Sequence, residues 1–225
     1  MADRGISRLG QSSYNSPYSR TGAPSPHPNT DIYAPLRKKA LSKLEAMGYD
    51  PQTMVEQGVL WAEHQDPFGH VMQAQYMSYL GSCFHRVMES YDDYLSPEEY
   101  GGVINGKTVV PVVRKYELEI RRQVMYPDTL IVAWLHQSIE PTRVTGIASL
   151  FSLQQQAIVA EVKGIGTYMD VKSGRPVDIR TLGGGWPSLF EAFTEKSSKA
   201  RALQEKWARE NPKDADRVRR SDSKI

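Results

Sequence analysis

Apolar side chains recur at intervals of three and four residues between positions 72 and 95, which predicts a long helix there. The stripe consists of Met77, Leu80, Phe84, Val87 and Tyr91, and it is widened by Tyr76, Cys83 and Met88. A helix that is apolar over such a wide arc needs neighbours on most of its sides. We therefore expect this segment to be the central helix of the fold.

The period of the pattern changes to two after Lys107, which is typical of strands with one buried face. Apolar and charged residues alternate from Lys115 to Arg121, and further strands are predicted over residues 130–139, 145–153 and 157–170. A short apolar strand is predicted earlier, over Val59 to Ala62. Between the long helix and the strands, Gly101-Gly102 and Asn105-Gly106 indicate a loop.

This order of elements predicts an α+β domain. The apolar face of the sheet needs a cover, and the helix over 72–95 is the only long apolar helix available. A curved antiparallel sheet wrapped around that helix follows. Extra helices are predicted on either side of this unit, over residues 34–47 at the N-terminal end and 188–210 at the C-terminal end.

Four regions follow from these elements. Residues 1–32 are rich in Ser, Pro and Gly and are predicted to be a disordered tail. Residues 33–57 form a short helical extension, and residues 58–180 form the main domain. Residues 181–225 begin with Gly183-Gly184-Gly185, which lacks the Lys-Ser/Thr of a phosphate loop and is interpreted as a hinge to the last helix and a charged tail.

Composition narrows the possible partners and the location. The net charge of the 225-residue chain is +2, which is too small to indicate nucleic acid as a partner, and no apolar run could span a bilayer. The single cysteine, Cys83, excludes an internal disulfide and fits a reducing compartment. Residues 1–30 lack a secretory apolar core, so we expect a cytoplasmic protein, with the mitochondrion as the alternative.

The most informative local feature is a carboxylate just before the central helix. Asp66 stands in the run Trp61-Ala62-Glu63-His64-Gln65-Asp66-Pro67-Phe68-Gly69-His70-Val71. The first amides of a helix have no partners within the helix and carry the positive end of its dipole. Asp66 is therefore either an ordinary capping residue or part of a site that attacks and polarises a carbonyl.

Three motifs in the correct order resemble one family. Asp66-Pro67-Phe68-Gly69-His70-Val71 followed by Tyr76 is similar to the pattern D-x-D-x-x-G-H-V-N-N-x-x-Y of hot-dog-fold acyl-CoA thioesterases of the 4-hydroxybenzoyl-CoA thioesterase type. Tyr126-Pro127-Asp128-Thr129-Leu130 resembles the Y-G-D-x-L turn before the third strand of that family. The stretch from Tyr168 to Pro176 resembles the closing V-D-x-x-T-G-R-P. The resemblance covers about residues 58–180 and implies a hot-dog fold.

The resemblance also implies roles for individual residues. Asp66 matches the catalytic aspartate, which acts as a nucleophile or as a general base on water. The amides of residues 70–73 match the helix terminus that polarises the thioester carbonyl. The residues expected to contact substrate are Gly69, His70, Val71, Gln73 and Tyr76. No cofactor and no metal is implied.

The sequence departs from the family pattern at three positions. His64 replaces the first aspartate, and Met72 and Gln73 replace the two asparagines. Gln73 can still donate a hydrogen bond, whereas Met72 cannot. His64 and His70 flank Asp66, but a transition-metal site would need three or four converging ligands, and no further His or acidic cluster is clearly placed to complete one.

Two functions therefore remain open. The first is hydrolysis of an acyl-CoA or other acyl thioester by Asp66. The second is a non-catalytic hot-dog protein for binding or assembly, with an acyl pocket altered at Met72 and Gln73. A single sheet of this kind has an exposed edge. The resemblance implies that dimerisation covers this edge, so we expect a homodimer or a dimer of dimers.

Overall fold

The structure is a computed structural model that describes residues 9, 12, 16–18 and 31–212. Its centre is an antiparallel sheet with the strand order β1-β3-β4-β5-β2, and a short strand β6 pairs with β5. The strands are β1 (Val55–Gly58), β2 (Val109–Ile120), β3 (Thr129–Glu140), β4 (Arg143–Ser152), β5 (Ala157–Asp170) and β6 (Arg175–Pro176). The four long strands confirm the predicted ones to within a few residues. The predicted disordered tail lies mostly outside the described residues.

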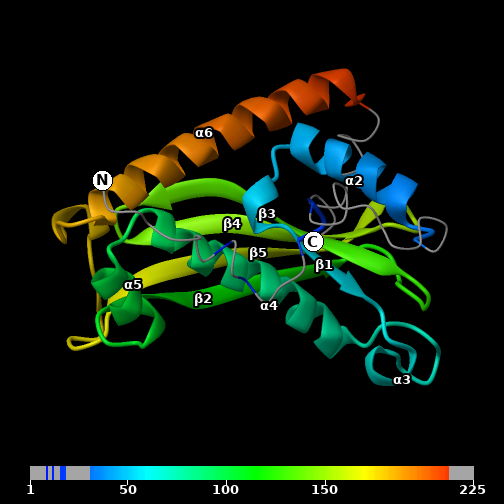
Figure 1. The fold of residues 1–225 in the computed structure, drawn as a ribbon, viewed down its shortest axis with the longest axis horizontal. Helices are drawn as coiled ribbons and strands as arrows, with labels where there is room; N and C mark the ends of the chain where they lie inside the picture. Colours follow the sequence, from blue (N-terminus) through cyan, green and yellow to red (C-terminus); the bar gives the residue numbers. More distant parts are fainter. Residues whose placement is uncertain (1–8, 10–11, 13–15, 19–30, 213–225) are drawn as a thin grey trace.

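Helix α4 (Gln73–Glu89) lies across the inner face of the curved sheet (Figure 1). Its side chains Tyr79, Leu80 and Cys83 are at most 3% exposed, and they belong to the same apolar cluster as Leu130 and Val132 of β3. A short 3-10 turn, η2 (Ser90–Asp93), continues the helix. The prediction of a central helix wrapped by an antiparallel sheet is confirmed, and so is the burial of the Cys83 thiol.

The strand predicted over Val59 to Ala62 is wrong. The first strand is β1, which pairs antiparallel with β3 over Val55–Gly58, and the residues after it form one helical turn, α3 (Trp61–His64). Leu60 and Trp61 are 49% and 65% exposed. A short apolar run forms a strand only where a neighbouring strand pairs with it through backbone hydrogen bonds. The local sequence does not show whether such a neighbour exists. The sheet thus begins before residue 58, the predicted start of the domain.

Part of the outer face of the sheet is covered as well. Helix α2 (Ala34–Ala46) lies along this side in Figure 1, whereas helix α6 (Trp186–Glu210) contributes Ala200 to the apolar cluster on this side and Phe193 to the cluster around α4. Alternate residues of β3, including Ile131 and Leu135, form a second apolar cluster with Leu41 and Leu44 of α2. Side chains of a strand point alternately to its two faces, so β3 supplies both cores. Its nearly continuous apolar sequence reflects this double burial.

Helix α5 (Pro97–Ile104) occupies part of the segment predicted to be a loop. Ser96 accepts a hydrogen bond from the Glu99 amide, and the Glu99 carboxylate accepts one from the Ser96 amide. This capping box satisfies two amides that the start of a helix leaves free. It therefore supports a helix despite the two internal glycines at 101 and 102.

Glu99 also fixes the Gly-rich segment that was interpreted as a hinge. Its carboxylate accepts a hydrogen bond from the Gly185 amide at 3.1 Å. Gly183 and Gly184 have φ angles of +72° and +58°, which favour glycine. A Cβ on Gly184 would lie 1.9 Å from Glu99 Oε1. The segment is a closely packed turn that sets the direction of α6. Within residues 31–212, none of the helices has the length and apolar character needed to cross a bilayer.

Candidate active site at the start of α4

Asp66 lies half-buried in a tight turn that immediately precedes α4. One carboxylate oxygen, Oδ1, accepts hydrogen bonds from the amides of Phe68 (2.8 Å) and His70 (3.0 Å). Its own amide donates to the His70 carbonyl at 2.7 Å. The second oxygen, Oδ2, accepts no hydrogen bond within the described part of the chain. Asp66 thus caps its own turn through one oxygen and keeps the other available.

Backbone contacts hold this turn against the start of the helix. Gln65 and Val71 form an isolated antiparallel bridge, and the Met72 amide donates to the His64 carbonyl at 2.8 Å. The Val71 amide donates to the Val124 carbonyl, also at 2.8 Å. These bonds place the segment with Asp66 alongside the residues that open α4. The geometry is set by backbone and is therefore insensitive to the side chains at Met72 and Gln73.

These bonds correct the expected set of polarising amides. The amides of His70, Val71 and Met72 are all used within the protein, so only Gln73 remains of the predicted range 70–73. The Gln73 and Ala74 amides make no hydrogen bond among the described residues. Met72 is the N-cap of α4, and its side chain makes no capping bond. The available donors therefore begin one residue inside the helix, at Gln73.

Gly69 has a φ angle of +81°, a conformation that L side chains rarely adopt. A Cβ placed there would meet no atom within 4 Å. Glycine is therefore required by the backbone of the turn, and the space above it is open. Contact of a substrate with Gly69 stays a prediction.

The other residues expected to contact substrate divide into two groups. Val71 and Tyr76 are 5% and 2% exposed and belong to the core cluster. Burial raises the pKa of the Tyr76 hydroxyl. His70 is half-buried and Gln73 is exposed. Val71 and Tyr76 support the helix from within, and direct contact of any of the four with substrate stays a prediction.

His64, which stands where the family has its first aspartate, is bound to the helix. Its Nδ1 accepts the Leu60 amide at 2.9 Å and lies 2.6 Å from the Tyr79 hydroxyl. A backbone amide only donates, so Nδ1 is unprotonated and a neutral ring carries its proton on Nε2. Burial lowers the pKa of His64, which favours this neutral form. His64 therefore orders the turn through a neutral ring, whereas the family pattern has a carboxylate there.

Exposed apolar side chains surround the turn. Phe68 is 81% exposed, and Trp61 stacks edge-on against Tyr126 with ring centroids 5.7 Å apart. Leu60, Met72 and Met125 are also at least 36% exposed. A concentration of large exposed apolar groups around one site indicates a surface that another molecule covers.

An apolar cavity lies further along α4, between the helix and strands β2 to β5. Its lining includes Leu80, Phe84 and Trp134, but neither Asp66 nor any residue expected to contact substrate. The sequence analysis missed this cavity. The sequence does contain one indication of it. Gly164 and Gly166 interrupt a predicted strand at two-residue spacing, and glycine inside a strand often marks a place where a ligand or another backbone approaches the strand closely.

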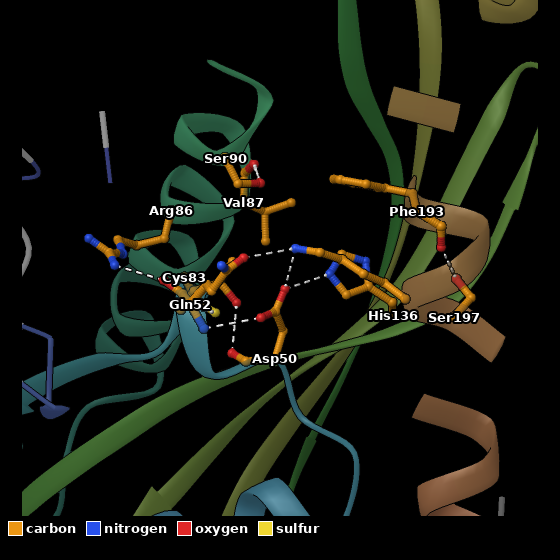
Figure 2. A network of polar contacts seen from close by, with 11 residues as sticks. Asp50, Gln52, Cys83, Arg86, Val87, Ser90, His136, Phe193 and Ser197 are labelled. Atoms are coloured by element: carbon orange, nitrogen blue, oxygen red, sulfur yellow. Dashed lines mark hydrogen bonds and ion pairs between the residues drawn. The ribbon is translucent and has the colours of Figure 1, made fainter. Parts of the chain in front are cut away.

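A second group of charged side chains surrounds Asp50, between the sheet, α4 and α6 (Figure 2). Asp50 Oδ2 accepts hydrogen bonds from His136 Nε2 (3.1 Å) and Lys196 Nζ (2.8 Å). Burial alone would raise the pKa of Asp50, but the bond from His136 and the charge of Lys196 outweigh it and hold the pKa well below its usual range. Burial lowers the pKa of His136, although Asp50 opposes this.

This second group links elements and provides no reactive nucleophile. His136 is 4% exposed and stacks on Phe193 of α6 at 4.9 Å between ring centroids. The neighbouring Cys83 thiol donates to the Thr53 carbonyl at 3.5 Å, and burial raises its pKa, so the thiolate is disfavoured. We interpret Asp50, His136 and Lys196 as a buried link between β3 and α6.

The basic residues on the strands give a short set of candidates for binding phosphates. Arg121 is paired with Glu119 and Glu161. Arg114, Arg122 and Arg143 make no ion pair within the described ranges. Among residues 31–212, no three His, Cys, Asp or Glu side chains converge in a way that could hold a metal ion.

Comparison with known proteins identifies the class of this fold and site. Residues 59–193 match the model of the Thioesterase-like superfamily. The chain belongs to this superfamily. No curated protein sequence matches the chain.

Solved structures with the same hot-dog fold include the DHNA-CoA thioesterase from Staphylococcus aureus. It has a TM-score of 0.52 and 13% identity, and the match covers 68% of this chain and 93% of that one. A 1,4-dihydroxy-2-naphthoyl-CoA thioesterase from Synechocystis has a TM-score of 0.49 and 12% identity over 61% and 93% of the two chains. At 13% identity, the likeness to the S. aureus enzyme concerns the fold.

The Asp50 group predicts a dependence of stability on pH. The pKa of His136 is lower in the folded protein than in the unfolded chain, where it is about 6.5. Between these two values the unfolded chain binds more protons, so the stability that neutral His136 contributes is present above pH about 6.5 and is lost as the pH falls below it. Urea unfolding should give a lower free energy at pH 5.5 than at pH 7.5.

His136→Gln should reduce this difference, because glutamine can still donate to Asp50 but does not titrate. Replacement of the exposed His85 by glutamine is the matched control and should retain the difference seen in the wild type. An equal pH dependence in wild type and His136→Gln would contradict the assignment.

Proposed function

We propose that this protein hydrolyses an acyl thioester, with coenzyme A or an acyl carrier as the thiol, and that Asp66 is the catalytic residue. The main support is the arrangement of the carboxylate, which is anchored through Oδ1 while Oδ2 remains available. Membership of the Thioesterase-like superfamily agrees with this chemistry. The motif resemblance to the 4-hydroxybenzoyl-CoA thioesterase type, and the CoA thioester in the name of the S. aureus neighbour, favour coenzyme A.

The proposed mechanism needs one base and one set of donors. In the general-base route, Oδ2 takes a proton from water while the water oxygen bonds to the carbonyl carbon. The carbonyl oxygen becomes negative and accepts hydrogen bonds from the amides of Gln73 and Ala74, which make no other hydrogen bond among the described residues. The carbon–sulfur bond then breaks, and the thiolate leaves with the electron pair and takes up the proton held by Asp66, which restores the carboxylate. The products are the free acid and the thiol.

In the nucleophilic route, Oδ2 itself bonds to the carbonyl carbon and the thiolate leaves. The resulting mixed anhydride is opened by water, which restores Asp66 and releases the acid. The same two amides stabilise the negative oxygen in both routes. The anchoring of Oδ1 by two amides keeps Oδ2 oriented in either case, so both routes remain within this proposal.

The alternative function is a non-catalytic hot-dog protein that binds a thioester or takes part in an assembly. Met72, in the position of a family asparagine, presents no hydrogen-bond donor and is 36% exposed. The structure offers the Gln73 amide as a donor in its place. We therefore favour hydrolysis. An activity assay without turnover would support binding without hydrolysis.

We also propose a homodimer. Among the described strands, β2 pairs only with β5 and its other edge is open. Val112, Tyr116 and Ile120 along it are 41–50% exposed. An open edge of this length associates readily with another strand. Helix α2 covers part of the outer face of the sheet, which disfavours a dimer of dimers formed through that face.

The central prediction concerns Asp66→Asn. The amide oxygen of asparagine can still accept from Phe68 and His70, so the turn should persist, but the side chain is neither a base nor an anionic nucleophile. We expect kcat to fall by about 10²–10⁴-fold across a panel of acyl-CoA thioesters. Glu63→Gln, an exposed charge removal three residues away, should retain full activity. Turnover that survives Asp66→Asn would refute the role of Asp66, and no turnover in wild type would support the binding alternative.

A second prediction isolates the Gln73 amide. Proline is well tolerated at the first position of a helix, and Met72 already has the extended conformation that precedes proline, with φ −59° and ψ 143°. Gln73→Pro should therefore keep the helix but remove the donor, and lower kcat by about 10²–10³-fold. Gln73→Ala keeps the amide and removes only the side chain. Equal losses in both variants would assign the effect to the side chain.

The dimer is tested by light scattering of the purified full chain. We expect a mass of twice the 25.4 kDa chain, because a second copy would pair with the open edge of β2. A monomer mass at the concentrations used for activity assays would contradict the proposal.

A further inference from the structure

The cavity beside α4 has the composition of a site for an apolar group. Its volume is about 480 Å³ including the open mouth, and none of its lining side chains is charged. Tyr116 and Trp134 are the only residues of this lining whose side chains carry an O–H or N–H group. Binding sites for small molecules commonly combine such apolar walls with few polar groups.

Glycines in the sheet create this space. Gly164 and Gly166 of β5 line the cavity, and a Cβ on Gly164 would lie only in ordinary contact with Tyr116, at 3.7 Å. A Cβ at Gly164 would therefore cause no clash, and a larger side chain at this lining position would take up cavity space. Gly146 of β4, which pairs with Gly164, serves a different purpose. A Cβ there would lie 2.1 Å from the Trp134 ring, so its absence lets the indole lie directly on the sheet.

Trp134 has an unused donor in this apolar setting. The residue is 5% exposed, and its Nε1–H has no hydrogen-bond partner among the described residues. Buried indole N–H groups usually find a partner, and leaving one unpaired costs about 1–3 kcal/mol. Trp134 lines the cavity, so an acceptor carried by a bound molecule would supply the missing bond.

The position of Trp134 limits the length of that molecule. The Trp134 ring packs edge-on against Phe84, with ring centroids 6.5 Å apart. Phe84 lies eleven residues after Gln73, or about 16 Å along the helix at about 1.5 Å per residue. An extended chain covers roughly 1.2 Å per bond, so about a dozen bonds connect the Gln73 amide to the level of Trp134.

We propose that this cavity binds the acyl group of the thioester and that Trp134 Nε1–H donates a hydrogen bond to an oxygen near the far end of that group. The preferred substrates are then medium-length acyl groups with a terminal hydroxyl or carbonyl oxygen, and plain hydrocarbon chains of the same length are poorer substrates. This inference rests on the proposed function, because it takes the thioester carbonyl to lie at the start of α4. Trp134 determines specificity and takes no part in the chemical step.

The test compares three acyl-CoA thioesters with the same number of carbons: dodecanoyl, ω-hydroxydodecanoyl and β-hydroxydodecanoyl. The two hydroxylated forms are isomers, so their comparison separates the position of the oxygen from polarity. For the wild type we expect kcat/KM to be about 3–10-fold higher for the ω-hydroxy form than for the other two, the value of one neutral hydrogen bond. Trp134→Phe, which keeps an aromatic ring but removes the donor, should reduce this ratio to about one.

Tyr116→Phe is the matched control, because it removes the other donor at the cavity, and it should preserve the ratio. A wild-type ratio near one, a preference shared by the β-hydroxy isomer, or a preference that survives Trp134→Phe would each overturn the proposal. A preference lost in Tyr116→Phe would overturn the assignment to Trp134.

Gly164→Val tests the cavity without altering Trp134. Filling the space should lower the hydrolysis of dodecanoyl-CoA relative to butanoyl-CoA, whose acyl group is too short to reach Gly164, and an unchanged ratio would count against the cavity. If no thioester is hydrolysed, the proposed function fails, but calorimetry with the free acids still decides the inference. Tighter binding of ω-hydroxydodecanoate than of dodecanoate in wild type, lost in Trp134→Phe, would support it, and equal binding would overturn it.

Discussion

The burial of α4 in the curve of the sheet is the constraint on which the other features depend. Tyr79, Leu80 and Cys83 of the helix pack against the inner side of β3, and this contact removes a large apolar surface from water. The position of the helix fixes the position of its N-terminus. The free amides at Gln73 and the turn with Asp66 are therefore held by the core rather than by the surface loop alone.

The start of α4 shows how a backbone network can preserve a site whose side chains have changed. The Gln65–Val71 bridge and the bond from Met72 to the His64 carbonyl orient the turn without using the side chains of Met72 or Gln73. Substitutions at these positions leave the carboxylate and the amide donors in place. His64, where the family pattern has an aspartate, bonds to Tyr79 of the helix and so contributes to the order of the turn.

The helices outside the sheet change the surroundings of the site without contributing to it. α2 covers part of the outer face, and the buried Asp50 joins α6 to β3 through Lys196 and His136. A buried carboxylate is stable only with hydrogen-bonded partners, and both are present here. The sheet ends at the short strand β1 on one side and at the long strand β2 on the other, and β2 offers the longer edge to a second copy.

The sequence by itself determined the central helix, the four long strands and the place of Asp66, because periodicity and the spacing of motifs are local properties. It also marked Gly69, whose positive φ only glycine adopts easily. Three elements were not predicted. Strand β1 and the packed turn at Gly184 depend on partners distant in sequence. Helix α5 forms because its capping box stabilises the helix by more than its two glycines destabilise it. The hydrogen-bonding state of the amides at the start of α4 and of the Trp134 indole also depends on residues distant in sequence. Only the tertiary structure shows which hydrogen-bonding groups are already satisfied. The Val71 amide donates to the Val124 carbonyl, whereas the Trp134 indole N–H has no acceptor among the described residues.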